Sequence, residues 1–213
     1  MVSAATKILV ADQQPIVRDG LAAWLVDCPD LNLVATADST VTVEQALTRH
    51  RPHILITDLQ LNGDITLPMF SDWLQRCPEL LIMVYSMSDE RMFARRCLTA
   101  GARGYLMKSS DREALVGALR ELHANQSYLS ASMKQNLIEY LFKHGPRSAQ
   151  AVSLTDRQYL ILSLIGEGRS RSEIAKLLGL SVKTIDAHKT NIRERLGLEN
   201  SQALIHYAIS FRA

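Results

Sequence analysis

KILVADQQPIVRDGLAAWLV, residues 7–26, joins a short apolar run to an amphipathic segment. The run KILVA at 7–11 has the composition of a β-strand. In the segment after it, apolar side chains recur at helical spacing: Val17, Leu21, Trp24 and Leu25. The stretch therefore predicts a strand, a loop that begins with Asp12, and a helix.

The same succession occurs four more times before residue 125. The later strand candidates are LNLVATA at 31–37, HILITDL at 53–59, LLIMVYS at 80–86 and GYLM at 104–107, and a helical pattern follows each of them. Strands that are separated by helices favour right-handed crossovers and a parallel sheet covered on both faces. We predict an α/β fold, with a five-stranded doubly wound parallel sheet of the flavodoxin-like kind.

The last 61 residues, 153–213, have a purely helical pattern. Four segments open with a capping residue (Thr155, Ser170 or Ser172, Ser181, Asn200 or Ser201), and several close with glycine. We predict a second, all-α four-helix domain at 153–213 after a first domain at 1–125. Between them, 126–152 would be a linker that contains one helix near 131–143 and the flexible stretch HGPRSAQA.

Composition and charge restrict the class of protein. Hydrophobic residues make up 47% and charged residues 22% of the chain, as in ordinary globular proteins. No apolar run is long enough for a signal peptide or a membrane span, and the 3 cysteines lack metal-ligand spacing, so we expect a soluble cytoplasmic protein without zinc or disulfide. Residues 1–125 carry 12 basic and 15 acidic side chains, whereas 153–213 carry 9 and 6, which makes the second part the candidate for binding phosphate backbones.

Four polar side chains lie at the ends of four different strands of the predicted sheet: Asp12, Asp58, Ser86 and Lys108. Ligands of doubly wound sheets bind at the carboxyl ends of the strands, so we expect these side chains to converge. A lone aspartate at a strand end is more often a turn former, but four such residues together favour a site. The chemistry that they suggest is phosphoryl transfer to a carboxylate, assisted by a divalent cation.

These residues, in the motifs VADQQP, ITDLQLNG, VYSMSD and GYLMKSS, resemble the receiver domain of bacterial two-component response regulators over residues 5–125. The resemblance implies that Asp58 is the phospho-acceptor and that Ser86 and Lys108 bind the phosphoryl group, with Tyr105 as the switch residue. It also implies a Mg²⁺ site made by Asp12, Asp58 and the backbone carbonyl of Gln60, and a sensor histidine kinase as partner.

Two positions depart from the receiver pattern. Receivers usually carry two adjacent acids after the first strand, whereas Gln13 here follows Asp12. With Lys108, the remaining acids Asp12 and Asp58 give a formal charge of −1 in place of −2, which should weaken Mg²⁺ binding. The loop after Asp58 reads LNGD where the family favours Met-Pro-Gly. Control without phosphorylation therefore remains an alternative.

The segment SRSEIAKLLGLSVKTIDAHKTNIRERLGL, 170–198, reads as helix, turn and helix. Ile185, His188, Ile192 and Leu196 form the inner face of the second helix. The side chains left for DNA contacts on its outer surface are Lys183, Thr184, Asp186, Lys189, Thr190, Arg193 and Arg195. A helix that presents cations and hydroxyl groups suits the major groove of double-stranded DNA.

This part resembles the LuxR-type helix-turn-helix, so the whole chain is similar to response regulators of the NarL/FixJ family. Gln158 stands where glutamate is usual, and Asp186 stands where lysine is common. Asp186 would repel phosphate but could accept a hydrogen bond from cytosine. The family implies a homodimer through the last helix, whose apolar stripe would serve intrachain packing equally well: Ala203, Leu204, Tyr207, Ala208 and Phe211.

The leading interpretation is a DNA-binding transcriptional regulator, not an enzyme, that is controlled through an N-terminal receiver. A signalling adaptor, whose pseudo-receiver acts by protein binding, is the alternative. An enzyme with a flavodoxin-like fold is a third, which no glycine-rich phosphate loop and no zinc spacing supports.

Overall fold

The structure is a computed structural model that describes residues 5–135 and 154–210. The chain divides into two compact units, residues 1–130 and 131–213, and each is described here by itself. Most of the helix expected at 131–143, the stretch HGPRSAQA and Phe211 lie outside the described residues. Within the described ranges, every helix is too short or too polar to cross a lipid bilayer.

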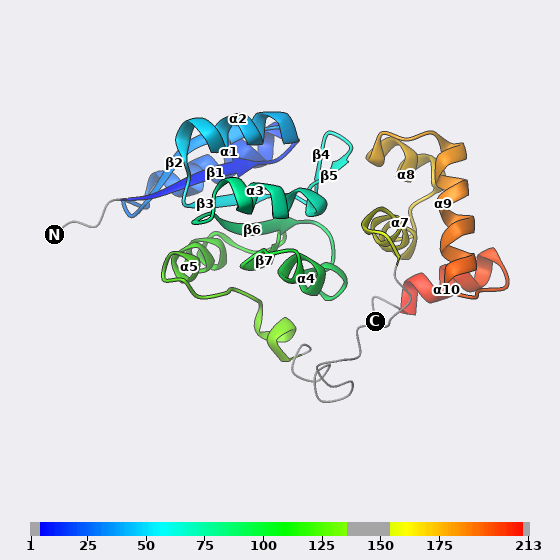
Figure 1. The fold of residues 1–213 in the computed structure, drawn as a ribbon. Coiled ribbons are helices and arrows are strands. Elements are labelled where there is room, and N and C mark those ends of the chain that lie inside the picture. The colour runs from blue at the N-terminus through cyan, green and yellow to red at the C-terminus, as the bar shows by residue number, and fades with distance from the viewer. Residues whose placement is uncertain (1–4, 136–153, 211–213) are drawn as a thin grey trace. The chain divides into compact units, whose positions relative to one another are not determined.

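Unit 1 is built on a five-stranded sheet in the order β2-β1-β3-β6-β7 (Figure 1). Each pair of neighbouring strands is parallel. The strands are β1 (Thr6–Ala11), β2 (Leu31–Ala37), β3 (Ile54–Thr57), β6 (Leu81–Ser86) and β7 (Gly104–Met107). The prediction of a five-stranded parallel sheet is confirmed.

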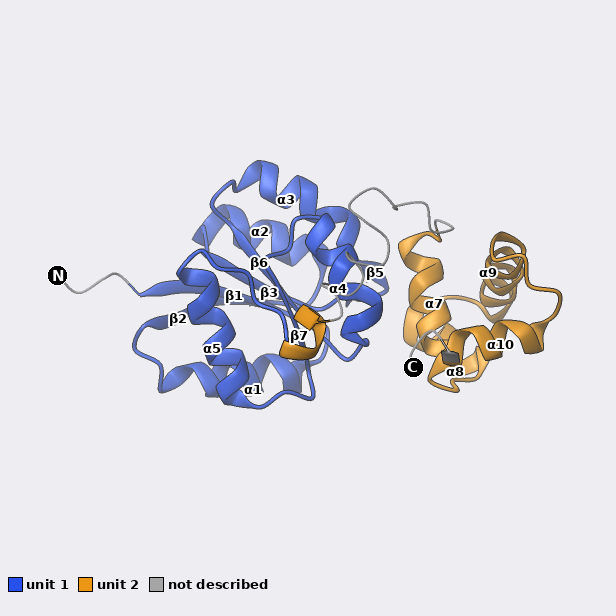
Figure 2. Ribbon diagram, turned by 90° about the horizontal axis from the view of Figure 1, so that it is seen from below, with its two compact units in different colours: residues 1–130 blue, residues 131–213 orange. Residues whose placement is uncertain are grey.

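Helices cover both faces of this sheet. They are α1 (Pro15–Val26), α2 (Thr40–His50), α3 (Phe70–Arg76), α4 (Glu90–Thr99) and α5 (Arg112–His123). Figure 2 shows α1 and α5 on one side of the sheet and α2 and α3 on the other. Because both faces are covered, the inner strands are mainly apolar, and β3 is buried at all four positions.

A two-stranded hairpin follows β3 and was not predicted from the sequence. It consists of β4 (Gln60–Leu61) and β5 (Asp64–Ile65), which pair antiparallel. The two residues between them, Asn62 and Gly63, have φ angles of +48° and +91°. Positive φ at both central positions is typical of the type I′ turn, for which Asn-Gly is the preferred sequence. The departure LNGD is therefore a tight hairpin, which a short 3-10 turn, η1 (Leu67–Met69), follows before α3.

The segment after α5 returns to the edge of the sheet. The backbone N–H of Tyr128 donates to the carbonyl of Arg103 at 2.9 Å, and the N–H of Tyr105 donates to the carbonyl of Tyr128 at 3.2 Å. The Ser130 hydroxyl lies 2.5 Å from the carboxylate of Glu90 in α4. The chain that leaves unit 1 is thus hydrogen-bonded to β7 and α4.

Unit 2 contains four described helices in its helix-turn-helix part: α7 (Asp156–Gly166), α8 (Arg171–Leu178), α9 (Val182–Arg195) and α10 (Ser201–Ser210). Their N-caps are Thr155, Ser170, Ser181 and Asn200. Gln158, the residue that replaces the usual glutamate, completes a capping box, because its side-chain oxygen accepts the N–H of Thr155 at 2.9 Å. The predicted four-helix domain is confirmed.

Candidate functional site

Four side chains from four strand ends meet at one edge of the sheet of unit 1. The ammonium of Lys108, which follows β7, lies 2.6 Å from Oδ2 of Asp12 and 2.5 Å from Oδ2 of Asp58. The hydroxyl of Ser86, at the end of β6, donates to Oδ1 of Asp58 at 2.7 Å. Parallel strands place their carboxyl ends together, which is why residues up to 96 positions apart form one cluster.

The backbone around Asp58 fixes the direction of its carboxylate. The N–H of Leu59 donates to Oδ1 at 2.6 Å. The backbone carbonyl of Asp58 accepts the hydroxyl of Thr66 at 2.7 Å and that of Thr57 at 3.0 Å. The side chain of Asp58 is 15% exposed, so a small molecule can approach the carboxylate from solvent. Thr66 was not anticipated from the sequence, because its contact depends on the hairpin that returns the chain to Asp58.

Asp12 is more deeply enclosed than Asp58. Its side chain is 3% exposed, and Oδ1 accepts the N–H of Gln14 at 2.8 Å. The guanidinium of Arg18 in α1 donates to the backbone carbonyl of Asp12 at 2.6 Å. Helix α1 therefore holds the loop in which Asp12 lies.

The charges in this cluster are not balanced. Burial raises the pKa of Asp58 above its usual value, although Lys108 and Ser86 act in the opposite direction. Burial also disfavours the charged form of Lys108, but the attraction of Asp58 and Asp12 outweighs it and raises the pKa of the ammonium. One buried ammonium thus pairs with two carboxylates, and the remaining negative charge favours the binding of a second cation.

Gln13 is directed to the hairpin. Its side-chain oxygen accepts the N–H of Asn62 at 3.1 Å. On the other side of the hairpin, the hydroxyl of Thr40 donates to Asp64 at 3.2 Å. The residue that replaces the second acid thus ties the loop after β1 to the turn between β4 and β5. Gln60, whose carbonyl was expected to bind Mg²⁺, begins β4 and so lies two residues after Asp58 on this same hairpin.

Tyr105 lies inside unit 1. The residue is 0% exposed, and its hydroxyl donates to the backbone carbonyl of Ser88 at 2.8 Å. Burial raises the pKa of this hydroxyl well above its usual value, so the group stays neutral and can donate. The side chain connects β7 to the loop that follows Ser86.

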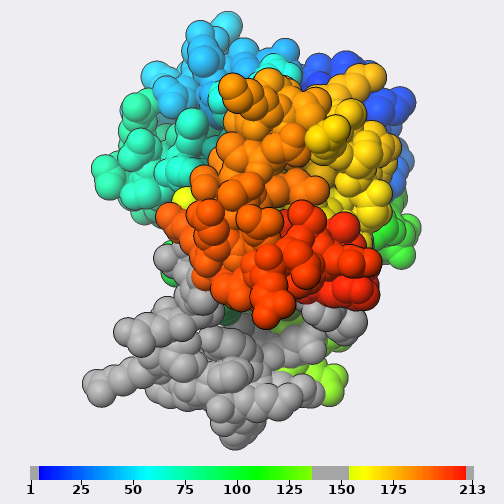
Figure 3. All heavy atoms as spheres, turned by 90° about the vertical axis from the view of Figure 1, so that its right-hand side faces the viewer, coloured from blue at the N-terminus to red at the C-terminus, as the bar shows by residue number. Residues whose placement is uncertain are grey.

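Helix α9 of unit 2 presents polar side chains along its surface. Ile185 and Ile192 are buried on its inner face. Among the residues expected to contact DNA, those exposed are Lys183, Thr190 and Arg195, and those half-exposed are Thr184, Asp186, Lys189 and Arg193. Figure 3 shows α9 (orange) with its side chains at the surface of unit 2.

Four of these seven residues line one polar cavity of about 250 Å³, namely Asp186, Lys189, Thr190 and Arg193. Arg171 in α8 also lines it, and its guanidinium lies 3.3 Å from the carboxylate of Asp186. Thr184 instead takes part in the cap of α9, where its N–H donates to Ser181 at 3.1 Å. Arg171 was missed in the sequence, because only the crossing of α8 and α9 brings it to Asp186.

Two family descriptions match the two parts of the chain. Residues 8–120 match "Response regulator receiver domain". Residues 152–208 match "Bacterial regulatory proteins, luxR family".

The similarity to known proteins extends over nearly the whole chain. The oxygen regulatory protein NreC of Staphylococcus carnosus is 32% identical over 209 residues, which are 95% of this chain and 96% of that protein. NreC of Staphylococcus aureus MRSA252 is also 32% identical, with the same coverage.

Solved structures of the RcsB response regulator from Salmonella typhimurium have the same architecture. One superimposes with a TM-score of 0.68 at 25% identity and covers 98% of this chain and 99% of that chain. Another, RcsB bound to promoter rprA in the presence of phosphomimetic BeF₃⁻, has a TM-score of 0.64 at 25% identity, with 96% and 98% covered.

Proposed function

The chain belongs to the NarL/FixJ family of response regulators, in which a receiver precedes a LuxR-type helix-turn-helix, and on that premise we propose that Asp58 controls its DNA binding. The chain is a DNA-binding response regulator, and the expectation that it is not an enzyme agrees with this family. The observation that carries the proposal is the position of the Lys108 ammonium at the carboxyl ends of the strands. It contacts both Asp12 and Asp58, and the side chain of Asp58 is partly exposed to solvent.

Phosphorylation of Asp58 would proceed by attack of a carboxylate oxygen on the phosphorus of a phosphodonor. The new bond joins that oxygen to phosphorus, and the bond from phosphorus to the leaving group breaks, so that a small donor such as acetyl phosphate releases acetate. Lys108 would turn from the carboxylates to the phosphoryl oxygens, and the Ser86 hydroxyl would donate to them. Both groups already contact Asp58, at 2.5 Å and 2.7 Å.

The residues of the cluster fit a Mg²⁺ site with the minimum number of carboxylate ligands. Mg²⁺ is usually held by one or two carboxylates, with water and phosphate as the other ligands. The contacts of the Lys108 ammonium with both Asp12 and Asp58 support a cation shared by these two carboxylates. The backbone carbonyl of Gln60 would be a third ligand. When bound, the ion would neutralise charge on the incoming phosphoryl group.

Phosphorylation would be transmitted through the residues next to the cluster. Ser86 begins the loop whose Ser88 carbonyl accepts the Tyr105 hydroxyl, so a shift of Ser86 reaches β7. Because the chain after α5 is hydrogen-bonded to Tyr105 and α4, this shift would extend to the segment that leads to unit 2.

A dimer on DNA is proposed from RcsB, for which one structure is described as two dimers bound to two parallel DNAs. Of the apolar stripe on α10, Leu204 and Ala208 are buried within this chain. The large apolar side chains that α10 leaves exposed are Ile205 at 41% and Ile209 at 53%. We assign the dimer contact to this exposed side. A sensor histidine kinase would be the physiological phosphodonor.

The test of the proposal is the intact mass of the full-length protein after incubation with acetyl phosphate and Mg²⁺. We expect the mass of one phosphoryl group to be added to the native protein and nothing to be added to Asp58→Asn. The control Asp64→Asn removes an acid from the neighbouring hairpin, which lies outside the cluster, and should still gain the group. No gain in the native protein would exclude phosphorylation control and favour a receiver that works without it.

A further inference from the structure

We propose that unit 1 carries a small-molecule site next to the acidic cluster, in a cavity between α1 and the ends of β6 and β7. The molecule that fits it is small, flat, uncharged and mostly apolar, with one hydrogen-bonding group. Its consequence for regulation rests on the proposed function, but its existence does not.

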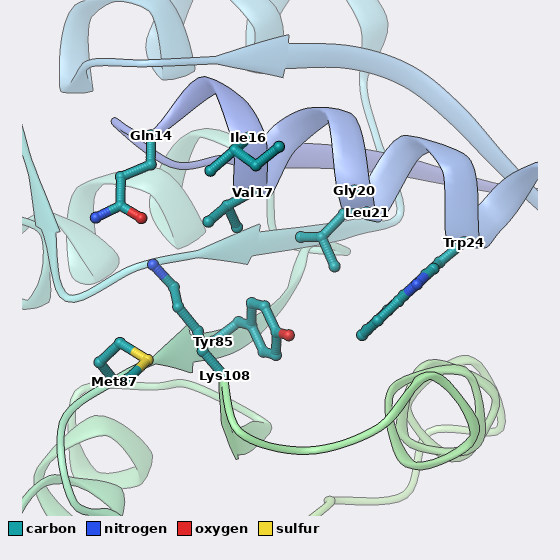
Figure 4. Close-up of a pocket in the computed structure, with 9 residues that line it drawn as sticks. All are labelled: Gln14, Ile16, Val17, Gly20, Leu21, Trp24, Tyr85, Met87 and Lys108. Carbon is teal, nitrogen blue, oxygen red and sulfur yellow. The ribbon is translucent and has the colours of Figure 1, made fainter.

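The cavity has a volume of about 280 Å³. Its apolar walls come from one side of α1, from β6 and from the loop after β6, namely Ile16, Val17, Leu21, Trp24, Tyr85 and Met87. Figure 4 shows these side chains around one space, with Trp24 at one end and Lys108 and Gln14 at the other. Concave apolar spaces with a few polar groups are the usual form of a small-ligand site.

Apolar side chains that solvent reaches form part of the rim of the cavity. Ile16 is 77% exposed and Met87 is 67% exposed. Leu21, by contrast, is 3% exposed and Tyr85 is 5% exposed. The cavity therefore has an apolar floor and a largely apolar rim, so a bound molecule would cover apolar surface that is now in contact with water.

Gly20 keeps the middle of the cavity open. It lies inside α1, where glycine is unfavourable, and its backbone does not require glycine. A Cβ added at Gly20 would meet no atom within 4 Å. What glycine provides at this position is space along the wall formed by α1. Gly117 in α5 is equally unobstructed but does not line the cavity, which makes it a matched control.

The polar groups restrict the chemistry of the ligand. No hydrogen bond joins the Tyr85 hydroxyl to the residues that the structure describes, and Figure 4 shows this hydroxyl directed toward the Trp24 side of the cavity. A ligand atom can therefore take the place of water there. Burial also raises the pKa of Tyr85, so the hydroxyl remains neutral.

Charge excludes ions from the cavity. Lys108 already serves Asp12 and Asp58, and these three groups sum to −1, which disfavours an anion. The lining residues include no carboxylate that would pair with a cation. An uncharged molecule, whose flat body lies near the Trp24 indole, meets both conditions.

The cavity shares residues with the acidic cluster. Lys108 lines it, Met87 directly follows Ser86, and the N–H of Gln14 holds Asp12 at 2.8 Å. A bound molecule would restrict Lys108 and the loop after β6. Binding should therefore change the rate at which Asp58 is phosphorylated.

The experiment uses two dyes with the same aromatic skeleton and the full-length protein. N-phenyl-1-naphthylamine is uncharged and carries one N–H, whereas 8-anilino-1-naphthalenesulfonate adds a sulfonate. We expect saturable fluorescence enhancement by the uncharged dye, and binding of the sulfonate weaker by roughly tenfold or more. Gly20→Leu should weaken binding of the uncharged dye by roughly tenfold, and Gly117→Leu should leave it within about twofold.

Two further measurements keep the outcome clear. If Gly20→Leu does not give a native circular dichroism spectrum, Met87→Gln replaces it, because Met87 is exposed and its change should weaken dye binding several-fold without affecting the fold. Asp58→Asn should bind the dye as the native protein does, so a failure of phosphorylation leaves this result intact. Absence of saturable dye binding would overturn the proposal. Dye binding that Gly20→Leu and Met87→Gln both leave unchanged would also overturn it.

Discussion

We expect Gln13 to limit how strongly the acidic cluster attracts a divalent cation. Its side chain brings an amide in place of a charge, and its oxygen is engaged by the N–H of Asn62. We expect Gln13→Asp to raise the affinity for Mg²⁺ by roughly tenfold, or about 1.4 kcal/mol, because a third acid changes the formal charge of the cluster from −1 to −2. Isothermal titration calorimetry with MgCl₂ measures this change directly.

The matched control for that substitution is Gln13→Asn. Asparagine has the length of aspartate and likewise gives up the reach to Asn62, but it adds no charge. Its affinity for Mg²⁺ should remain near that of the native protein. Equal gains in both variants would mean that release of the hairpin, and not charge, governs cation binding.

The residues of the cluster were predictable to the extent that they follow strands. Asp12, Asp58, Ser86 and Lys108 each come directly after an apolar run, and parallel strands bring such positions together. The partners of Gln13 and Asp186 were not predictable in this way. Asn62 reaches Gln13 only because a tight hairpin turns there, and Arg171 reaches Asp186 only where two helices cross.

At the scale of elements, two glycines in unit 1 have opposite roles. Gly101, just after α4, has a φ of +108°, and an added Cβ would lie 2.5 Å from Cδ1 of Leu74 in α3. Gly20 lies inside α1 in open space. We expect Gly101→Ala to lower the free energy of unfolding by about 1–3 kcal/mol, through strain and overpacking. Gly20→Ala should raise it by up to about 1 kcal/mol, through helix propensity. Urea unfolding of both variants gives the two signs, and a loss in Gly20→Ala would contradict the open space assigned to that wall.

The elements with periodic patterns were predicted, and the short ones were missed. The strands of the main sheet and the helices have apolar spacings long enough to read. The hairpin has two residues in each strand, too few for any alternation, although Asn62-Gly63 carried the signal of its turn. The return of Tyr128 to the edge of β7 also has no local signal, because a single bridge is decided by where α5 ends.

For the whole molecule, the division into an acidic receiver and a basic helix-turn-helix could be read from charge and pattern. Residues 1–125 carry 12 basic and 15 acidic side chains, and residues 153–213 carry 9 and 6. The structure consists of two compact units, residues 1–130 and 131–213. The small excess of positive charge in the second part matters because it is gathered on α9, where Lys189 and Arg193 share one cavity.

This arrangement predicts how salt acts on DNA binding by the full-length protein. Each cation that contacts a phosphate releases a counterion, so Lys189→Gln should weaken binding and reduce the slope of log K against log salt by roughly 1 per chain. Arg49→Gln removes the same charge from an exposed position of α2 in the receiver, and it should change neither quantity.

Asp186→Asn should act in the opposite direction to Lys189→Gln and tighten binding, because it removes a carboxylate from the cavity and frees Arg171 for phosphate. Mobility shifts over a range of potassium chloride concentrations measure all three variants, and equal losses in Lys189→Gln and Arg49→Gln would show that net charge, rather than the surface of α9, holds the DNA.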